Sequence, residues 1–136
     1  MIGLDTNIVV AAINRRSPRV RERLLQTLMD GEVIAVPTIV LFEMWYGIKK
    51  SAQPKRNADN LADFLALDMI HWPFEPEDAE EAGDIRAALE RAGTPIGPYD
   101  ILIAAQARRR NATLATANRR EFARVPGLRI EDWAAA

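Results

Sequence analysis

The sequence predicts an α/β fold in which a mostly parallel central sheet of about five strands lies between layers of helices. Two observations lead to this prediction. Short apolar stretches alternate along the chain with longer stretches of helical periodicity, and capping residues, prolines or glycines separate them. This alternation favours parallel pairing, because each helix returns the chain to the same edge of the sheet. We therefore expect a single domain over residues 1–136.

The first half of the chain is expected to contain two strands and three helices. Asp5 and the two polar residues after it are typical of a helix start, and Ser17–Pro18 is a second such signal. Gly31 is typical of the residue that ends a helix. In order, we expect a strand over 1–4, helices over 8–13 and 18–29, a strand over 33–36 and a helix over 39–51.

The second half continues the same alternation. Acidic residues at 75–78 favour a helix start, since the helix dipole stabilises negative charge there, and Gly93 favours its end. The proline-rich residues 94–98 predict a rigid loop. In order, we expect a helix over 57–66, a strand over 69–72, helices over 75–92 and 100–110, a strand over 113–116, a turn or short helix over 118–122 and an edge strand over 128–130.

The composition excludes several kinds of site. Its 49% hydrophobic and 27% charged residues are ordinary for a globular protein with a buried core. The chain has no cysteine, which excludes disulfides, thiolate ligands and cysteine nucleophiles and fits a cytoplasmic location. Its single histidine, His71, makes a zinc site or a histidine-based triad hard to assemble. No apolar stretch is long enough to cross a membrane, and the N-terminus lacks the features of a signal peptide.

Positive charge is unevenly distributed, although the net charge is only −1. Five arginines lie between Arg15 and Arg23, and a second group runs from Arg108 to Arg124. Such zones can bind phosphates even in a chain of balanced charge. Solvated helix faces are the plainer interpretation, and the arginines at 108–110 would also complement the dipole at the end of a helix.

Three acidic residues, Asp5, Glu43 and Asp100, open or interrupt strongly apolar segments. Glu43 lies in a helix that is apolar nearly all round, so its charge needs a cation or hydrogen-bond donors unless it reaches the helix edge. Asp5 and Asp100 have a plainer role open to them, as helix N-caps. In α/β sheets, however, ligands bind beyond the carboxyl ends of the strands, where the three acids could meet. Together they would need a hard cation, Mg²⁺ or Mn²⁺, which supports phosphodiester hydrolysis.

Four segments, taken in order, resemble one known family. Leu4–Asp5–Thr6–Asn7 begins the chain, Glu43 lies inside an apolar helix, residues 94–105 (TPIGPYDILIAA) start another, and residues 114–128 close the pattern. Together they resemble PIN-domain proteins of the VapC toxin type, over essentially the whole chain. The resemblance implies a PIN-like three-layer fold and a Mg²⁺- or Mn²⁺-dependent endoribonuclease that cleaves structured RNA, with transfer RNA the favoured substrate. It also implies a cytoplasmic homodimer, the toxin of a toxin–antitoxin pair, inhibited by a VapB-type antitoxin.

The resemblance also assigns roles within the site. It implies that Asp5, Glu43 and Asp100 are the metal-binding and catalytic acids, and that the Thr6 hydroxyl supports the first of them. Many members of the family hold a fourth acid after the fourth strand.

In that region this chain offers Thr116, Asn118 and Glu121. Asn118 fits a common variant that orients water or an acid, and Glu121 is the alternative source of the fourth acid. Two further positions depart from the family pattern. Tyr99 stands where asparagine is frequent and Gln106 where histidine is frequent, and either exchange could change substrate fit.

Four arginines are the expected RNA-binding residues, because phosphates near the site need positive partners. They are Arg15, Arg16, Arg108 and Arg119.

Two other functions compete with the ribonuclease. One is a catalytically silent module that acts by binding an antitoxin, with the acids serving only as caps. The other is a phosphoacceptor domain, which needs paired acids after the first strand and a lysine after the last. The chain has a single Asp5 at the first place, and its lysines lie at 49, 50 and 55.

Overall fold

Five short strands form one sheet in which every neighbouring pair is parallel. The structure, a computed structural model, describes residues 1–14 and 17–134. The strands are β1 (Ile2–Leu4), β2 (Ile34–Pro37), β3 (Ile70–Trp72), β4 (Thr113–Thr116) and β5 (Arg129–Asp132), in the spatial order β3-β2-β1-β4-β5. The expected α/β fold is therefore confirmed, with a sheet that is parallel throughout the described residues.

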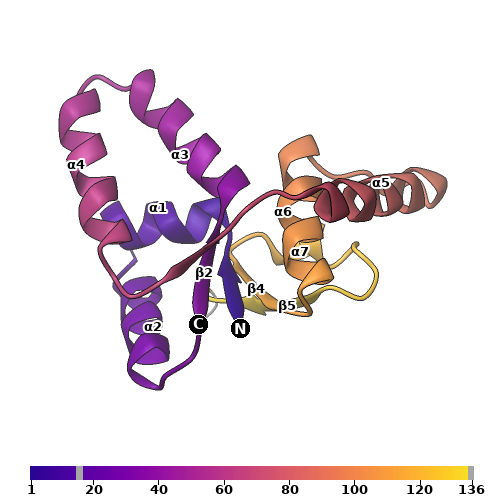
Figure 1. The fold of residues 1–136 in the computed structure, drawn as a ribbon, viewed down its shortest axis with the longest axis horizontal. Helices are drawn as coiled ribbons and strands as arrows, with labels where there is room; N and C mark the ends of the chain where they lie inside the picture. Colours follow the sequence, from indigo (N-terminus) through magenta and orange to yellow (C-terminus); the bar gives the residue numbers. More distant parts are fainter. Residues whose placement is uncertain (15–16, 135–136) are drawn as a thin grey trace.

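Helices lie on both sides of this sheet. In the described part of the chain they are α1 (Thr6–Asn14), α2 (Pro18–Met29), α3 (Thr38–Lys49), α4 (Pro54–Leu65), α5 (Pro76–Arg91), α6 (Pro98–Arg109) and α7 (Arg119–Phe122). Figure 1 shows α1 to α4 on one side of β1 and β2, and α5 and α6 on the other. None of these helices is long and apolar enough to cross a membrane.

Strand β1 lies at the centre of the sheet, between β2 and β4, and its register aligns the ends of two strands. Leu4, the last residue of β1, is fully buried and pairs with Ala115. The Asp5 N–H then donates to the Ala115 carbonyl at 2.9 Å. Because β4 ends one residue later, at Thr116, the residues that follow β1 and β4 emerge side by side at one edge.

Trp72 is the last residue of β3, and its indole ring packs directly on β1. A Cβ at residue 3 would lie 2.4 Å from an indole carbon of Trp72, closer than atoms can approach. Gly3 is therefore required by the packing of the buried indole and not by its own backbone conformation.

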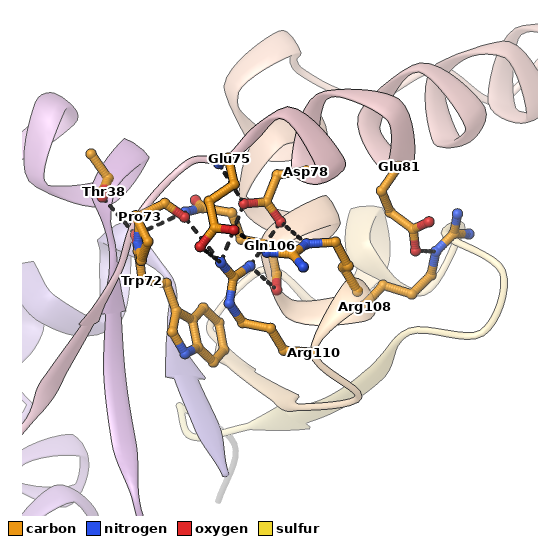
Figure 2. A network of polar contacts seen from close by, with 10 residues as sticks. Thr38, Trp72, Pro73, Glu75, Asp78, Glu81, Gln106, Arg108 and Arg110 are labelled. Carbon is orange, nitrogen blue, oxygen red and sulfur yellow. Dashed lines mark hydrogen bonds and ion pairs between the residues drawn. The ribbon is translucent and has the colours of Figure 1, made fainter.

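A buried carboxylate, Asp78, anchors the C-terminal end of α6. Arg109 Nε and Arg110 Nη1 donate to Asp78 Oδ1 at 2.6 and 2.8 Å. Arg110 Nη2 also donates to the Pro73 carbonyl at 3.0 Å, as Figure 2 shows. Burial alone would raise the pKa of the Asp78 carboxyl, but the hydrogen bonds from both guanidinium groups outweigh it and the pKa is lowered. The network ties α6 to α5 and to the segment after β3.

Several element boundaries differ from those expected. Helix α6 begins at Pro98 and not at Asp100, because proline is accommodated in the first turn, where its missing N–H has no partner to lose. Helix α1 begins directly after Asp5. Strand β5 runs to Asp132, two residues beyond its expected end.

Candidate active site

Asp5 is a buried carboxylate at the carboxyl end of β1, with 3% of its surface exposed. Its Oδ1 accepts the Thr6 N–H and its Oδ2 accepts the Thr116 hydroxyl, both at 2.8 Å. Burial raises the pKa of the Asp5 carboxyl, and the charges of Glu43 and Glu121 raise it further; the two hydrogen bonds lower it without restoring its ordinary value. The negative charge of Asp5 is therefore left partly uncompensated.

Glu43 reaches the same edge of the sheet from α3. Its Oε1 accepts the Thr6 hydroxyl at 2.8 Å. The expectation that this hydroxyl supports Asp5 is wrong, because the backbone N–H of Thr6 bonds to Asp5 and the hydroxyl bonds to Glu43. One threonine at the start of α1 thus orients two carboxylates at once.

Asp100 enters the site from the first turn of α6. The N-cap is Gly97, which makes no side-chain cap bond, so the interpretation of Asp100 as a helix cap is wrong. A Cβ at residue 97 would lie 3.3 Å from Asp100 Oδ2, and glycine leaves room for the carboxylate there. Burial, and then the charges of Asp5, Glu121 and Glu43, raise the pKa of Asp100 to about 7.

Glu121 brings a fourth carboxylate from α7. Its charge raises the pKa of both Asp5 and Asp100, and its carboxyl hydrogen-bonds to Asp100. Asn118 Nδ2 donates to Glu121 Oε2 at 3.1 Å, while the Asn118 N–H donates to the Thr116 hydroxyl at 2.8 Å. Between the two residues that the sequence left open, the geometry favours Glu121 as the acid and Asn118 as the residue that holds it.

The four carboxylates have no basic partner in the described part of the chain. None of them forms an ion pair with an arginine or lysine of residues 1–14 and 17–134. Within the same residues, no three acidic or histidine side chains stand close enough to hold one ion, so the expected ligand set stays a prediction. The chemistry of the group nevertheless fits a hard divalent cation, because it offers oxygen donors whose charges repel one another.

Known proteins share both the sequence and the fold. Residues 2–128 match the PIN domain family. The chain belongs to this family, and to its VapC group. It is 39% identical to the tRNA(fMet)-specific endonuclease VapC of Salmonella typhimurium and 41% identical to Ribonuclease VapC2 of Rickettsia felis, each over 131 residues and 96% of both chains.

A solved structure extends the similarity to three dimensions. The crystal structure of VapBC2 from Rickettsia felis, bound to a DNA fragment from their promoter, contains a chain with a TM-score of 0.90 and 40% identity. The match covers 98% of the present chain and 99% of that chain. The resemblance to VapC proteins is therefore confirmed over the whole sheet and its helices.

The arginines expected to bind RNA have different outcomes in this PIN domain. The expectation for Arg108 is wrong: its guanidinium donates to Glu81 at 2.8 Å and to Asp84 at 2.7 Å. It also lies eight residues along α6 from Asp100, about 12 Å away by the rise of a helix. Arg119 is exposed at the start of α7 and stays a prediction. Arg15 and Arg16 lie outside the described residues.

The two departures from the family pattern also differ in their surroundings. Gln106 is fully buried, and its Nε2 donates to the carbonyls of Trp72 and Pro73 at 3.0 and 3.1 Å (Figure 2). Gln106 therefore supports the fold directly, and an effect of this exchange on substrate fit stays a prediction. Tyr99 is 47% exposed and its ring contacts Phe42, with centroids 5.3 Å apart.

The aromatic residues of α3 could pack from their sequence either in the core or in a partner groove; the core, the plainer of the two interpretations, is wrong. Phe42, Trp45 and Tyr46 are all exposed, whereas the buried residues of the helix are Val40 and Ile48. A helix that is apolar on all sides cannot bury every side against one sheet edge. No periodicity in the sequence distinguishes the exposed face of α3 from the buried one.

Proposed function

We propose that this chain is a metal-dependent endoribonuclease that hydrolyses phosphodiester bonds in structured RNA. The observation that carries the proposal is the group of four carboxylates that β1, α3, α6 and α7 bring to one edge of the sheet without a basic partner in the described residues. Their proximity, together with burial, raises the pKa of Asp5 and of Asp100. Repulsion between neighbouring carboxylates destabilises the folded protein, and a bound divalent cation would neutralise it. The names of its close relatives support RNA as the substrate.

Asp5, Glu43 and Asp100 are the side chains that would hold Mg²⁺ or Mn²⁺. When bound, such an ion supplies positive charge beside the scissile phosphate and makes a water molecule a stronger acid. Thr6 and Thr116 orient the carboxylates that they contact, and Asn118 fixes Glu121 against Asp100. Because the pKa of Asp100 is raised to about 7, part of the protein carries a proton on this carboxyl near neutral pH, and that proton would be released when a cation binds there.

Transfer RNA is the substrate that the relatives favour, since one of them is a tRNA(fMet)-specific endonuclease. The toxin of a toxin–antitoxin pair is the corresponding biological role. The related structures are VapBC complexes, so we propose a VapB-type antitoxin as the partner and a homodimer as the assembly.

The test is cleavage of purified total transfer RNA by antitoxin-free protein in Mg²⁺ or Mn²⁺. Wild-type protein should release discrete fragments, and Asp5→Asn or a chelator should abolish them. Asp59→Asn, an exposed acid on α4, is the matched control and should cleave normally. Retained turnover in Asp5→Asn would remove the metal-site assignment.

The catalytically silent module is the second candidate function, and calorimetry separates it from the ribonuclease. This candidate treats the acids only as helix caps, and the position of Glu121 beside Asp5 and Asp100 weighs against it. A silent module takes up no Mn²⁺ through Asp5 and Asp100. A nuclease should bind Mn²⁺ with an affinity that falls in both the Asp5→Asn and the Asp100→Asn variants.

A further inference from the structure

Four exposed aromatic side chains lie on the two helices that carry Glu43 and Asp100. Phe42, Trp45 and Tyr46 are spaced three and four residues apart, so they lie on one face of α3, and Tyr99 lies in the first turn of α6. Their exposed fractions range from 41% for Trp45 to 60% for Tyr46. Large aromatic side chains exposed together in this way mark a binding surface more often than a solvated one.

Phe42 and Tyr99 connect this aromatic surface to the acidic group. Phe42 directly precedes Glu43 and Tyr99 directly precedes Asp100, so the two rings belong to the helical turns that carry two of the acids. The rings meet with centroids 5.3 Å apart and planes tilted by 58°. At this tilt the two rings are not stacked face to face, and about half of each residue is exposed to solvent.

Positive charge continues the same face of α3 away from the acids. Lys49 Nζ lies 5.6 Å from the centre of the Trp45 ring, and Lys50 Nζ lies 4.6 Å from that of Tyr46. These lysines follow Phe42 at seven and eight residues, the spacing that keeps them on its side of the helix. Exposed aromatic rings together with cations are typical of surfaces that bind single-stranded nucleic acid.

We propose that Phe42 and Tyr99 form a stacking platform for an unpaired base next to the phosphate that is cut, and that Lys49 and Lys50 bind the strand beyond it. The proposal rests on the ribonuclease function and names how the substrate is held. An RNA strand fits this surface because its bases can stack on the rings and its phosphates can pair with the lysines. Glu43 and Asp100 directly follow the two platform residues in the sequence. A base stacked on this pair holds the adjoining phosphate beside Glu43 and Asp100.

A binding experiment without cleavage tests the platform. Two fluorescein-labelled oligomers are compared by anisotropy in the presence of chelator: ten uridines, and a base-free ribose-phosphate chain of the same length. Wild-type protein should bind the uridine chain about tenfold more tightly than the base-free chain. The double variant Phe42→Ala/Tyr99→Ala should bind both chains equally, and the aromatic variants Phe42→Tyr and Tyr99→Phe should retain the preference. Met29→Ala, at an exposed apolar residue of α2, is the matched control.

The lysines are tested by the salt dependence of the same binding. Lys49→Gln/Lys50→Gln should weaken both chains alike and reduce the slope of log Kd against log salt by about 1.4, the value for two phosphate contacts on a single strand. Arg91→Gln, an exposed cation at the end of α5, should leave the slope unchanged.

The outcomes separate the platform from the nuclease and from a protein interface. A folded Phe42→Ala/Tyr99→Ala variant that keeps the preference for bases overturns the platform, whatever the wild type cleaves. Lack of cleavage by wild-type protein overturns the ribonuclease proposal and leaves the binding result interpretable. Sedimentation velocity identifies the remaining outcome. If wild-type protein is a dimer without a preference for the uridine chain, and Phe42→Ala/Tyr99→Ala is a monomer, the platform is overturned and the surface is an interface between two copies of the chain.

Discussion

Asp5 and Asp78 are both almost fully buried carboxylates, yet the chain treats their charges in opposite ways. Asp78 receives two guanidinium groups and its pKa is lowered. Asp5 receives a hydroxyl and a backbone N–H, neutral donors that do not offset burial and neighbouring acids, and its pKa is raised. A buried charge that the fold compensates is structural, whereas one that is left uncompensated indicates a place for something from outside the chain.

The two regions are connected through a single helix. The first turn of α6 carries Asp100 and its last turn carries Arg109, one of the partners of Asp78. Because the ion network holds the C-terminal end of α6 against α5, it also fixes the direction in which Asp100 enters the acidic group. The compensated charges thus support the geometry of the uncompensated ones.

The largest expected effect is the loss of cleavage in Asp5→Asn. We expect the rate of RNA cleavage to fall by about a thousandfold or more, because a charged oxygen ligand is lost while the side-chain volume is kept. The free energy of unfolding should not fall, since the repulsion with Glu43 and Glu121 is relieved. Cleavage assays and urea denaturation of the same preparation check both parts; an inactive variant that is also unstable would contradict the comparison.

The opposite result is expected for Asp78→Asn. Two arginines lose their charged partner, and the free energy of unfolding should fall by about 3 kcal/mol, the lower part of the range for breaking a buried pair because both guanidinium groups are partly exposed. Urea denaturation measures the loss, with Asp84→Asn, at a mostly exposed partner of Arg108, as the control. Cleavage by the folded fraction should stay within a fewfold of wild type, and a far larger loss would place Asp78 in the chemistry.

The dependence of stability on pH should distinguish Asp100 from ordinary acids. Well below pH 3.8 its carboxyl is protonated in both the folded and the unfolded chain, so Asp100→Asn and wild type should be equally stable. Between the ordinary value of 3.8 and the raised pKa of about 7, only the unfolded chain ionises, and wild type loses stability relative to the variant as the pH rises. Above pH 7 the variant should be more stable by about 1–2 kcal/mol, a value reduced for the partial exposure of the group.

Urea titrations with a chelator at pH 5, 6, 7 and 8 measure this difference. Saturating Mn²⁺ should then stabilise wild type more than Asp100→Asn and close the gap, because the cation binds the folded protein through the carboxylate. Parallel stability curves for the two proteins across this pH range would be the contrary outcome.

The smallest effect is expected for Thr6→Val. This exchange removes the hydroxyl that donates to Glu43 but keeps the backbone N–H that donates to Asp5. The free energy of unfolding should change by about 1 kcal/mol or less, and cleavage should fall by about tenfold because Glu43 is less well oriented. Thr6→Ser restores the hydroxyl and should recover most of the rate. An equal loss in both variants would show that the hydroxyl does not orient Glu43.

The residues alone predict the mostly parallel α/β architecture and three of the four acids of the candidate site, and the physical reasoning is similar in both cases. Short apolar strands between helical stretches allow few arrangements other than a parallel sheet, and an acid within or at the start of an apolar segment needs a special explanation. Asp5, Glu43 and Asp100 satisfy that criterion. Glu121 does not, because it lies in a polar segment. The family resemblance offers it only as an alternative to Asn118, and the bond from Asn118 and the interaction with Asp100 are what favour it as the acid.

Other features depend on contacts that no local pattern contains. An acid at a helix start and arginines at a helix end are typical of solvated helix termini, so the pairing of Asp78 with Arg109, 31 residues away, gives no signal in the sequence. The exposed rings of Phe42 and Trp45 have a related cause. Hydrophobicity measures the cost of contact with water, and it does not specify whether the partner is the core of the same chain or another molecule.

The bond between Thr116 and Asp5 spans 111 residues, and it has a consequence for the order of synthesis. Asp5 is translated before strand β4 and helix α7, which complete its surroundings, and 111 residues separate it from Thr116. A nascent chain cannot form β1–β4 pairing before residue 116 has emerged, so every earlier intermediate lacks the assembled acidic group. The acidic group of the proposed nuclease is therefore assembled only after the whole segment from β1 to α7 has been synthesised.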